Sequence, residues 1–157
     1  MATESPLIHD GGQTVLSTAN DARRSSITGT TLNGPNGSAQ YYPVYLSTTV
    51  DRTVALCSTT FGVQLSTGQA IYGILQNTPG PGQAADVGIF GISKYIAGST
   101  AIVRGTQLQT SSTVPGYLVP WAAGNGIRLG VAIESASAVG GVYTMAIYGF
   151  GQGSGST

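Results

Sequence analysis

Apolar residues are distributed unevenly along this chain, and their distribution divides it into three parts. Residues 1–40 contain few apolar side chains and are rich in Ser, Thr, Asn and Gly. From Tyr41 onward, short runs of Val, Ile, Tyr and Thr end at Gly, Pro or Asn, which is typical of strands separated by turns. Residues 150–157 consist mainly of Gly and Ser. We therefore expect an extended N-terminal arm over 1–40, a β-rich body over 41–149 and a flexible Gly/Ser tail over 150–157.

The runs within the body predict strands. In the clearest run, Tyr143, Met145 and Ile147 share one phase of a two-residue alternation, and Thr144 and Ala146 share the other. No window repeats apolar residues at helical spacing for more than a couple of turns, so we expect at most one short helix. The sequence predicts an all-β protein with a compact body, either a β-barrel or a β-tulip or sandwich. The candidate strands cover residues 42–49, 53–58, 70–76, 85–91, 93–97, 101–103, 107–110, 117–119, 127–133 and 142–148.

Glycine and proline indicate where the chain turns. Residues 77–82 read Asn-Thr-Pro-Gly-Pro-Gly. Proline lacks the N–H that a strand ladder needs, so this segment is expected to be an exposed loop between two strands. Residues 124–126 and 140–141 are glycine-rich and predict tight turns.

The charge of the chain is low and balanced. Only 8% of its residues are charged, and six acidic residues balance six basic ones. Without a net field, binding to nucleic acid or to acidic lipid is not expected, and Arg23 and Arg24 are the only adjacent basic pair. A weakly charged surface also lacks the repulsion that keeps soluble proteins apart, which suits a protein whose purpose is association. The alternative is that the low charge of a small protein has no functional meaning.

The residues that support catalysis are few and scattered. His9 is the only histidine and lies in the expected arm, and Cys57 is the only cysteine. The carboxylates of the body, Asp51, Asp86 and Glu134, are isolated in sequence, and no Gly-Lys-Ser/Thr motif follows a glycine-rich loop. We expect no catalytic, cofactor-binding or metal-binding residues, a passive thiol at Cys57, and no enzymatic activity. The chain also shows no signal peptide and no apolar run near about 18 residues, so no membrane span is expected.

Five apolar residues are candidates for contact with a partner. Leu7, Ile8, Val15 and Leu16 form two short patches in the arm, which could dock on another protein or belong to a disordered leader. Trp121 could anchor a subunit contact or cap the end of the barrel. The chain has eight tyrosines against three phenylalanines, and tyrosine suits surfaces that are partly packed and partly wet.

Residues 73–98 carry the sequence GILQNTPGPGQAADVGIFGISKYIAG. This segment resembles the capsid decoration proteins, or cement proteins, of tailed bacteriophages. In that family a strand ending in G-V-L-Q-N precedes a Pro/Gly loop, a strand with V-x-x-x-G-x-S-K, and then A-G. The similarity continues in residues 101–108, 130–137 and 142–148, so it covers roughly the second half of the chain. The first half matches no pattern of the family.

The resemblance implies a β-barrel or β-tulip body, commonly trimeric, on the outer surface of an icosahedral capsid. It implies two partners, the major capsid protein and other copies of the chain, and an N-terminal arm that runs over neighbouring capsid subunits. It implies no catalytic residue and no cofactor, and a protein made in the host cytoplasm and located in the virion. The function expected is therefore decoration and stabilisation of the capsid between major capsid protein subunits.

Two other functions remain open from the sequence. The chain could be a different virion β-domain, from a tail, a fibre or a head-completion protein. It could also be a carbohydrate-binding β-sandwich in which Trp121 and several tyrosines serve as stacking platforms for sugar rings. Catalysis is the last alternative, because it would need the scattered acids to meet in space.

Overall fold

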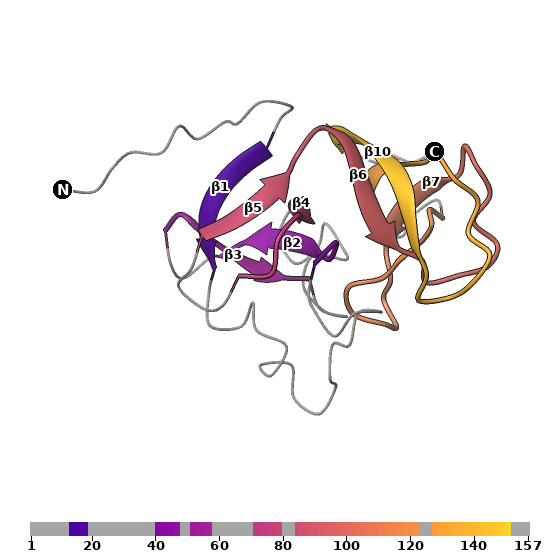
Figure 1. The fold of residues 1–157 in the computed structure, drawn as a ribbon, viewed down its shortest axis with the longest axis horizontal. Helices are drawn as coiled ribbons and strands as arrows, with labels where there is room; N and C mark the ends of the chain where they lie inside the picture. The colour runs from indigo at the N-terminus through magenta and orange to yellow at the C-terminus, as the bar shows by residue number, and fades with distance from the viewer. Residues whose placement is uncertain are drawn as a thin grey trace, which may run out of the picture.

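The computed structural model describes the backbone of Gln13–Thr18 and of residues 149–151, and the backbone and side chains of residues 40–47, 51–57, 71–79, 84–122 and 127–148. This described part contains ten strands and no helix, so the protein is all-β as the sequence predicts. The strands form two sheets that lie next to each other (Figure 1). No helix in these residues is long and apolar enough to span a bilayer.

The first sheet closes into a barrel with the strand order β1-β3-β2-β4-β5. Strand β1 runs antiparallel to β5 from the pair Gln13–Gly88 to the pair Ser17–Ala84, and parallel to β3 at the pair Ser17–Thr53. Part of the range expected as an arm therefore contributes backbone to the barrel. The strands are β1 (Gln13–Thr18), β2 (Pro43–Leu46), β3 (Thr53–Leu56), β4 (Ile71–Leu75) and β5 (Ala84–Gly88).

The second sheet has the order β6-β10-β9-β7-β8, with every neighbouring pair antiparallel. Its two edges approach each other, because Ala97 forms a parallel bridge with Leu118 and the Gly98 N–H donates to the Leu118 carbonyl at 2.7 Å. The sheet is therefore strongly curled. Its strands are β6 (Gly91–Ile96), β7 (Gln107–Thr110), β8 (Leu118–Pro120), β9 (Arg128–Ala132) and β10 (Val142–Gly151).

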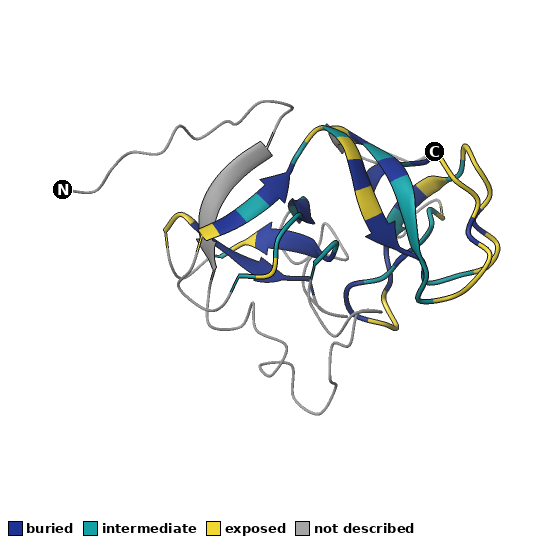
Figure 2. Ribbon diagram, in the orientation of Figure 1, coloured by how far each residue is buried: buried dark blue, intermediate teal, exposed yellow. Residues whose placement is uncertain are grey.

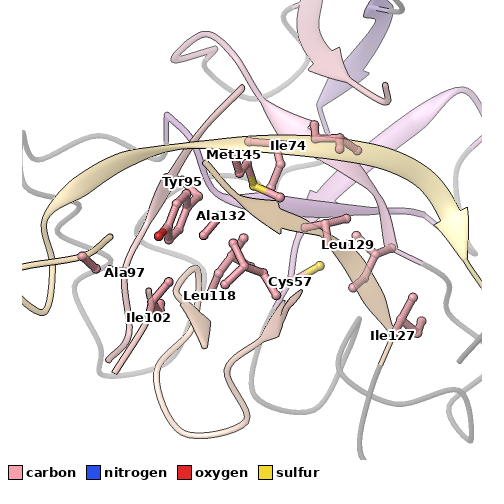
Figure 3. Packing of buried hydrophobic residues seen from close by; sticks show 14 of the residues in the cluster. Cys57, Ile74, Tyr95, Ala97, Ile102, Leu118, Ile127, Leu129, Ala132 and Met145 are labelled. Carbon is pink, nitrogen blue, oxygen red and sulfur yellow. The ribbon is translucent and has the colours of Figure 1, made fainter. Parts of the chain in front are cut away.

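Two apolar clusters hold the sheets together. Successive residues of the β3 segment alternate between them: Val54 belongs to one cluster, while Ala55 and Cys57 belong to the other. We call the cluster that contains Ala55 and Cys57 the central cluster. It joins Cys57 and Ile74, from the side of the first sheet, to Leu118 and Met145 of the second sheet (Figure 3). Strand β3 is buried along its whole length as a result (Figure 2), and both sheets contribute residues to the central cluster.

Most observed strands differ from the predicted ones by one to three residues at an end, and one predicted strand is absent. Residues 101–103 are not a strand: Ile102 is buried and accepts a bond from the Ala136 N–H at 2.8 Å, but no ladder continues to Val103. Strand β6 begins at Gly91, earlier than expected, because the φ of 95° at this glycine makes the turn after β5. Strand β10 extends to Gly151, past the predicted start of the tail.

The described turns follow the predicted chemistry. Gly140 has a φ of 80°, as the expected tight turn at 140–141 requires. Strands β4 and β5 are antiparallel neighbours on either side of the Pro/Gly loop. The Asn77 side chain joins their ends: its Nδ2 donates to the Ala84 carbonyl at 3.1 Å, and its Oδ1 accepts from the Asp86 N–H at 3.1 Å. The turn expected at 124–126 lies outside the described residues.

Candidate interaction surface

The titratable residues of the described part do not form a cluster that could bind a metal. Within the described ranges, no three His, Cys, Asp or Glu residues lie together. The Cys57 side chain is 1% exposed, and its burial raises the pKa of the thiol above the ordinary value. The thiol is therefore a poor nucleophile. His9 lies outside the described residues.

The most distinctive surface is the exposed part of the side of the second sheet that faces away from the central cluster; where this side reaches Ile96, it is buried in the other cluster. Along β6, Tyr95 is completely buried whereas Ile92 is 69% exposed, and Lys94 shares the exposed phase (Figure 2). Along β10, Met145 is buried whereas Tyr148 is 52% exposed. We call this exposed part the outer face; it comprises Ile92, Lys94, Val131, Thr144, Ala146 and Tyr148.

An apolar row crosses the centre of the outer face. Ile92 of β6 lies opposite Ala146 of β10, and Ala146 lies opposite Val131 of β9. Residues directly opposite each other on neighbouring strands have adjacent side chains. The row is therefore a continuous apolar strip across three strands, with its most exposed member at β6.

A polar row runs beside the apolar row. Lys94 Nζ donates to Thr144 Oγ1 at 2.7 Å, and Thr144 Oγ1 donates to Glu134 Oε1 at 2.8 Å. The Thr144 N–H also donates to Glu134 Oε2 at 3.0 Å. The hydrogen bonds from Thr144 lower the pKa of Glu134 below its ordinary value, and the charge of Lys94 lowers it further. The row thus carries a cation at β6, a hydroxyl at β10 and an anion beyond the end of β9.

Two exposed aromatic residues lie next to the end of the pairing between β6 and β10. Phe90 is 63% exposed and Tyr148 is 52% exposed. Gly91 of β6 pairs with Ile147 of β10; Phe90 directly precedes Gly91, and Tyr148 directly follows Ile147. Exposed apolar side chains that occur singly need no explanation, but a contiguous exposed apolar group is a candidate for contact with another molecule.

An open depression borders the polar row at Glu134. Val103, Arg104, Ile133, Glu134 and Ser135 line this depression, which has a volume of about 500 Å³. Its walls are mostly polar and its mouth is wide. Sites for small molecules are enclosed and predominantly apolar, so the depression does not resemble one.

Trp121, predicted as a possible contact residue, packs within the molecule. Its ring is partly buried, and Arg128 Cζ lies 4.2 Å from the ring centroid in a cation–π contact. The backbone N–H of Trp121 donates to the Gln107 carbonyl at 2.8 Å. Trp121 directly follows β8, and both alternatives for it, contact with a partner and capping of the barrel end, stay predictions.

The other four predicted contact residues lie in the N-terminal segment. Leu7 and Ile8 lie outside the described residues. Val15 and Leu16 belong to β1, where their backbones pair with Asp86 and with Ala85 of β5, but their side chains lie outside the described part. Their contact with a capsid subunit therefore also stays a prediction.

The sequence did not single out the residues of the outer face. A signal was present in residues 91–96, where Ile92 shares a phase with Lys94 and opposes the phase of Tyr95. An apolar residue on the charged phase of a strand is a candidate for intermolecular contact. Comparisons of this chain with protein families, with curated proteins and with solved structures found no match.

Proposed function

We propose that this chain is a structural virion protein that decorates and stabilises the outside of a tailed-phage capsid. It binds between major capsid protein subunits, as a homotrimer in the arrangement that the resemblance implies. The observation that carries the proposal is the outer face, where Ile92 and Tyr148 are each more than half exposed. Such a surface favours protein association. The likeness of residues 73–98 to decoration proteins supports the capsid as the site of assembly.

The charge of the chain supports the same role. With 8% charged residues and no net charge, the protein gains little from electrostatic attraction and loses little from repulsion. Attachment then depends on apolar and hydrogen-bonded contacts, and several such contacts on one shell multiply into strong retention. Attachment by these contacts depends weakly on salt, because screening acts mainly on exposed charges.

The alternative of carbohydrate binding has weaker support. It requires an aromatic ring with a free face on which a sugar can stack, for which the sequence offers Trp121 and several tyrosines. Arg128 covers one face of the Trp121 ring, and the exposed Tyr148 belongs to the mainly apolar outer face. We therefore prefer protein assembly, and a tail or fibre location remains the alternative within the virion.

The test is to locate the chain in particles from cells that produce it. Purified particles should contain the chain by mass spectrometry, and a cryo-electron microscopy reconstruction should place the two-sheet body on the capsid exterior. Washing with about 1 M NaCl, where the screening length is only about 3 Å, should leave the chain attached. Absence of the chain from particles, density in the tail, or release by salt alone would contradict the proposal.

A further inference from the structure

We propose that the outer face of the second sheet binds the same face of a second copy of this chain, with the two-fold axis parallel to β10. This inference rests on the proposed function only in treating the chain as an assembling protein. It goes further by naming the occupant of the outer face and the geometry of the contact. The contact is isologous, so each residue that meets a residue of the second copy is met by its equivalent in return.

The charges of the polar row select the second copy as the occupant. Lys94 lies on one side of Thr144 and Glu134 on the other, and both side chains are hydrogen-bonded to Thr144. A two-fold rotation about an axis along β10 exchanges the two sides of the face. Lys94 then lies over Glu134 of the second copy, and Glu134 lies over Lys94. The face is therefore complementary in charge to itself.

The same rotation matches the apolar rows. Ile92 lies over Val131 of the second copy, and Ala146 at the centre lies over its own equivalent. Ala146 is small, so the central strands can approach to the roughly 10 Å at which stacked sheets pack. The large side chain of Ile92, exposed by 69% in the single chain, is covered by the contact.

Another two-fold arrangement fails on the same charges. An axis across the strands and along the polar row would place Lys94 over Lys94 and Glu134 over Glu134. Like charges in direct opposition disfavour association. The polar row thus specifies the orientation, while the apolar row supplies the buried area.

The proposed pair is a different contact from a three-fold ring. The contacts in a ring join two different patches, whereas the outer face joins two identical ones. Both can coexist in an assembly of six copies with three-fold and two-fold axes. Light scattering should therefore find an even number of 15.9 kDa chains at micromolar concentration.

Charge exchange across the interface tests the inference. The variants Lys94→Glu and Glu134→Lys should each lower the association constant by about tenfold or more. In either variant, residues 94 and 134 carry the same charge, so the contact contains two pairs of like charges. An equimolar mixture of the two variants should recover association, because each Glu of the first variant then meets a Lys of the second. Sedimentation velocity measures all three samples. Failure of the mixture to associate beyond the separate variants would overturn the proposed contact.

A second pair of variants tests the apolar row. Ile92→Asp should abolish the two-fold contact, whereas Val139→Asp should leave it intact, because Val139 is 57% exposed in a turn and is not one of the outer-face residues. Circular dichroism must show that both variants are folded. A wild-type chain that is monomeric, or that forms only a trimer unaffected by Ile92→Asp, overturns the inference. If the chain is nevertheless present on purified capsids, the proposed function is still supported. Failure of the two-fold contact can therefore be distinguished from failure of the proposed function.

Discussion

The ring of Tyr42 packs directly against the backbone of Gly116. A Cβ atom at Gly116 would lie 2.4 Å from Cδ2 and Cε2 of that ring. Tyr42 is 1% exposed and directly precedes β2 of the first sheet, whereas Gly116 lies between β7 and β8 of the second. Gly116 also has a φ of 80°. The two sheets therefore meet at a position where only a residue without a side chain fits.

Gly116→Ala should destabilise the protein more than a glycine substitution that adds backbone strain alone. Gly105 is the matched control, because its φ is 89° and a Cβ there would meet no atom within 4 Å. We expect Gly105→Ala to lower the free energy of unfolding by about 1–2 kcal/mol. Gly116→Ala should cost about 1–3 kcal/mol more through overpacking against Tyr42. Urea unfolding measures both, and equal losses would show that the contact with Tyr42 is easily relaxed.

Local sequence patterns predicted most strands but not how the strands pair to close the barrel. The alternation of Tyr143, Met145 and Ile147 predicts β10 because it is visible within one segment. Strand β1 was missed because Gln13–Thr18 are mostly polar and their pairing with β5 joins residues about 70 positions apart. Such long-range pairing leaves no local signature.

The candidate surface was harder to predict for a related reason. The polar row exists only because the registers of three separate segments place Lys94, Thr144 and Glu134 side by side. Register depends on how the strands pair, and a shift of one residue would move each side chain to the other face. Composition favours association with other proteins as a prediction, and the sheet adds the outer face as a candidate surface for it.

Tyr95 and Tyr143 offer a contrast between two neighbouring hydroxyls. Their ring centroids are 6.1 Å apart. The Tyr95 hydroxyl is buried and has no hydrogen-bond partner in the part of the chain that the structure describes. The Tyr143 hydroxyl accepts from the N–H groups of Ser137 and Ala138, both at 2.9 Å, and bonds to Ser137 Oγ. We expect Tyr95→Phe to raise the free energy of unfolding by about 1 kcal/mol, and Tyr143→Phe to lower it by about 1–2 kcal/mol.

Thermal and urea unfolding of the two variants decide this prediction. Both variants remove one oxygen atom and retain the ring, so their difference isolates the hydrogen bonds. A loss of stability in Tyr95→Phe comparable to that in Tyr143→Phe would show that the Tyr95 hydroxyl is bonded in solution.

The same residue predicts a loss of stability in alkali. Burial, together with the nearby Tyr143 and Glu134, raises the pKa of Tyr95 from 10.0 to about 12. Below pH 10, Tyr95 is protonated in the folded and unfolded chain alike. Between pH 10 and 12 the unfolded chain releases this proton and the folded chain retains it, so stability falls as pH rises. Urea titrations across this range should show a smaller fall for Tyr95→Phe; an identical fall would mean that Tyr95 ionises normally.

Cys57 should be unreactive until the protein unfolds. It lies in the central cluster at 1% exposure, and burial raises the pKa of its thiol, so little thiolate forms near neutral pH. Because it is the only cysteine, a thiol-specific disulfide reagent reports one site. The labelling rate at pH 8 should be slow in buffer and should rise with urea in parallel with unfolding. Rapid labelling of the native protein would show that the core opens locally at β3.

Two N-terminal deletions can distinguish the contribution of residues 1–12 from that of β1, the strand that closes the barrel. Deletion of residues 1–12 retains β1, whereas deletion of residues 1–40 removes it and leaves the edges of β5 and β3 without the partner that pairs with both. The longer deletion should lower the free energy of unfolding by roughly 2–5 kcal/mol, if each of several lost backbone bonds contributes about 1 kcal/mol. It should also promote aggregation, since an uncovered strand edge can pair with another chain.

Urea midpoints and light scattering on the two truncated chains measure these effects. The chain without residues 1–12 should match the full-length protein in both. If the chain without residues 1–40 also matches it, β1 contributes nothing to the barrel, and the whole segment is the separable arm that its composition suggests. A lower midpoint for the longer deletion alone would instead place the boundary between arm and body before Gln13, because β5 needs its antiparallel partner to complete the sheet.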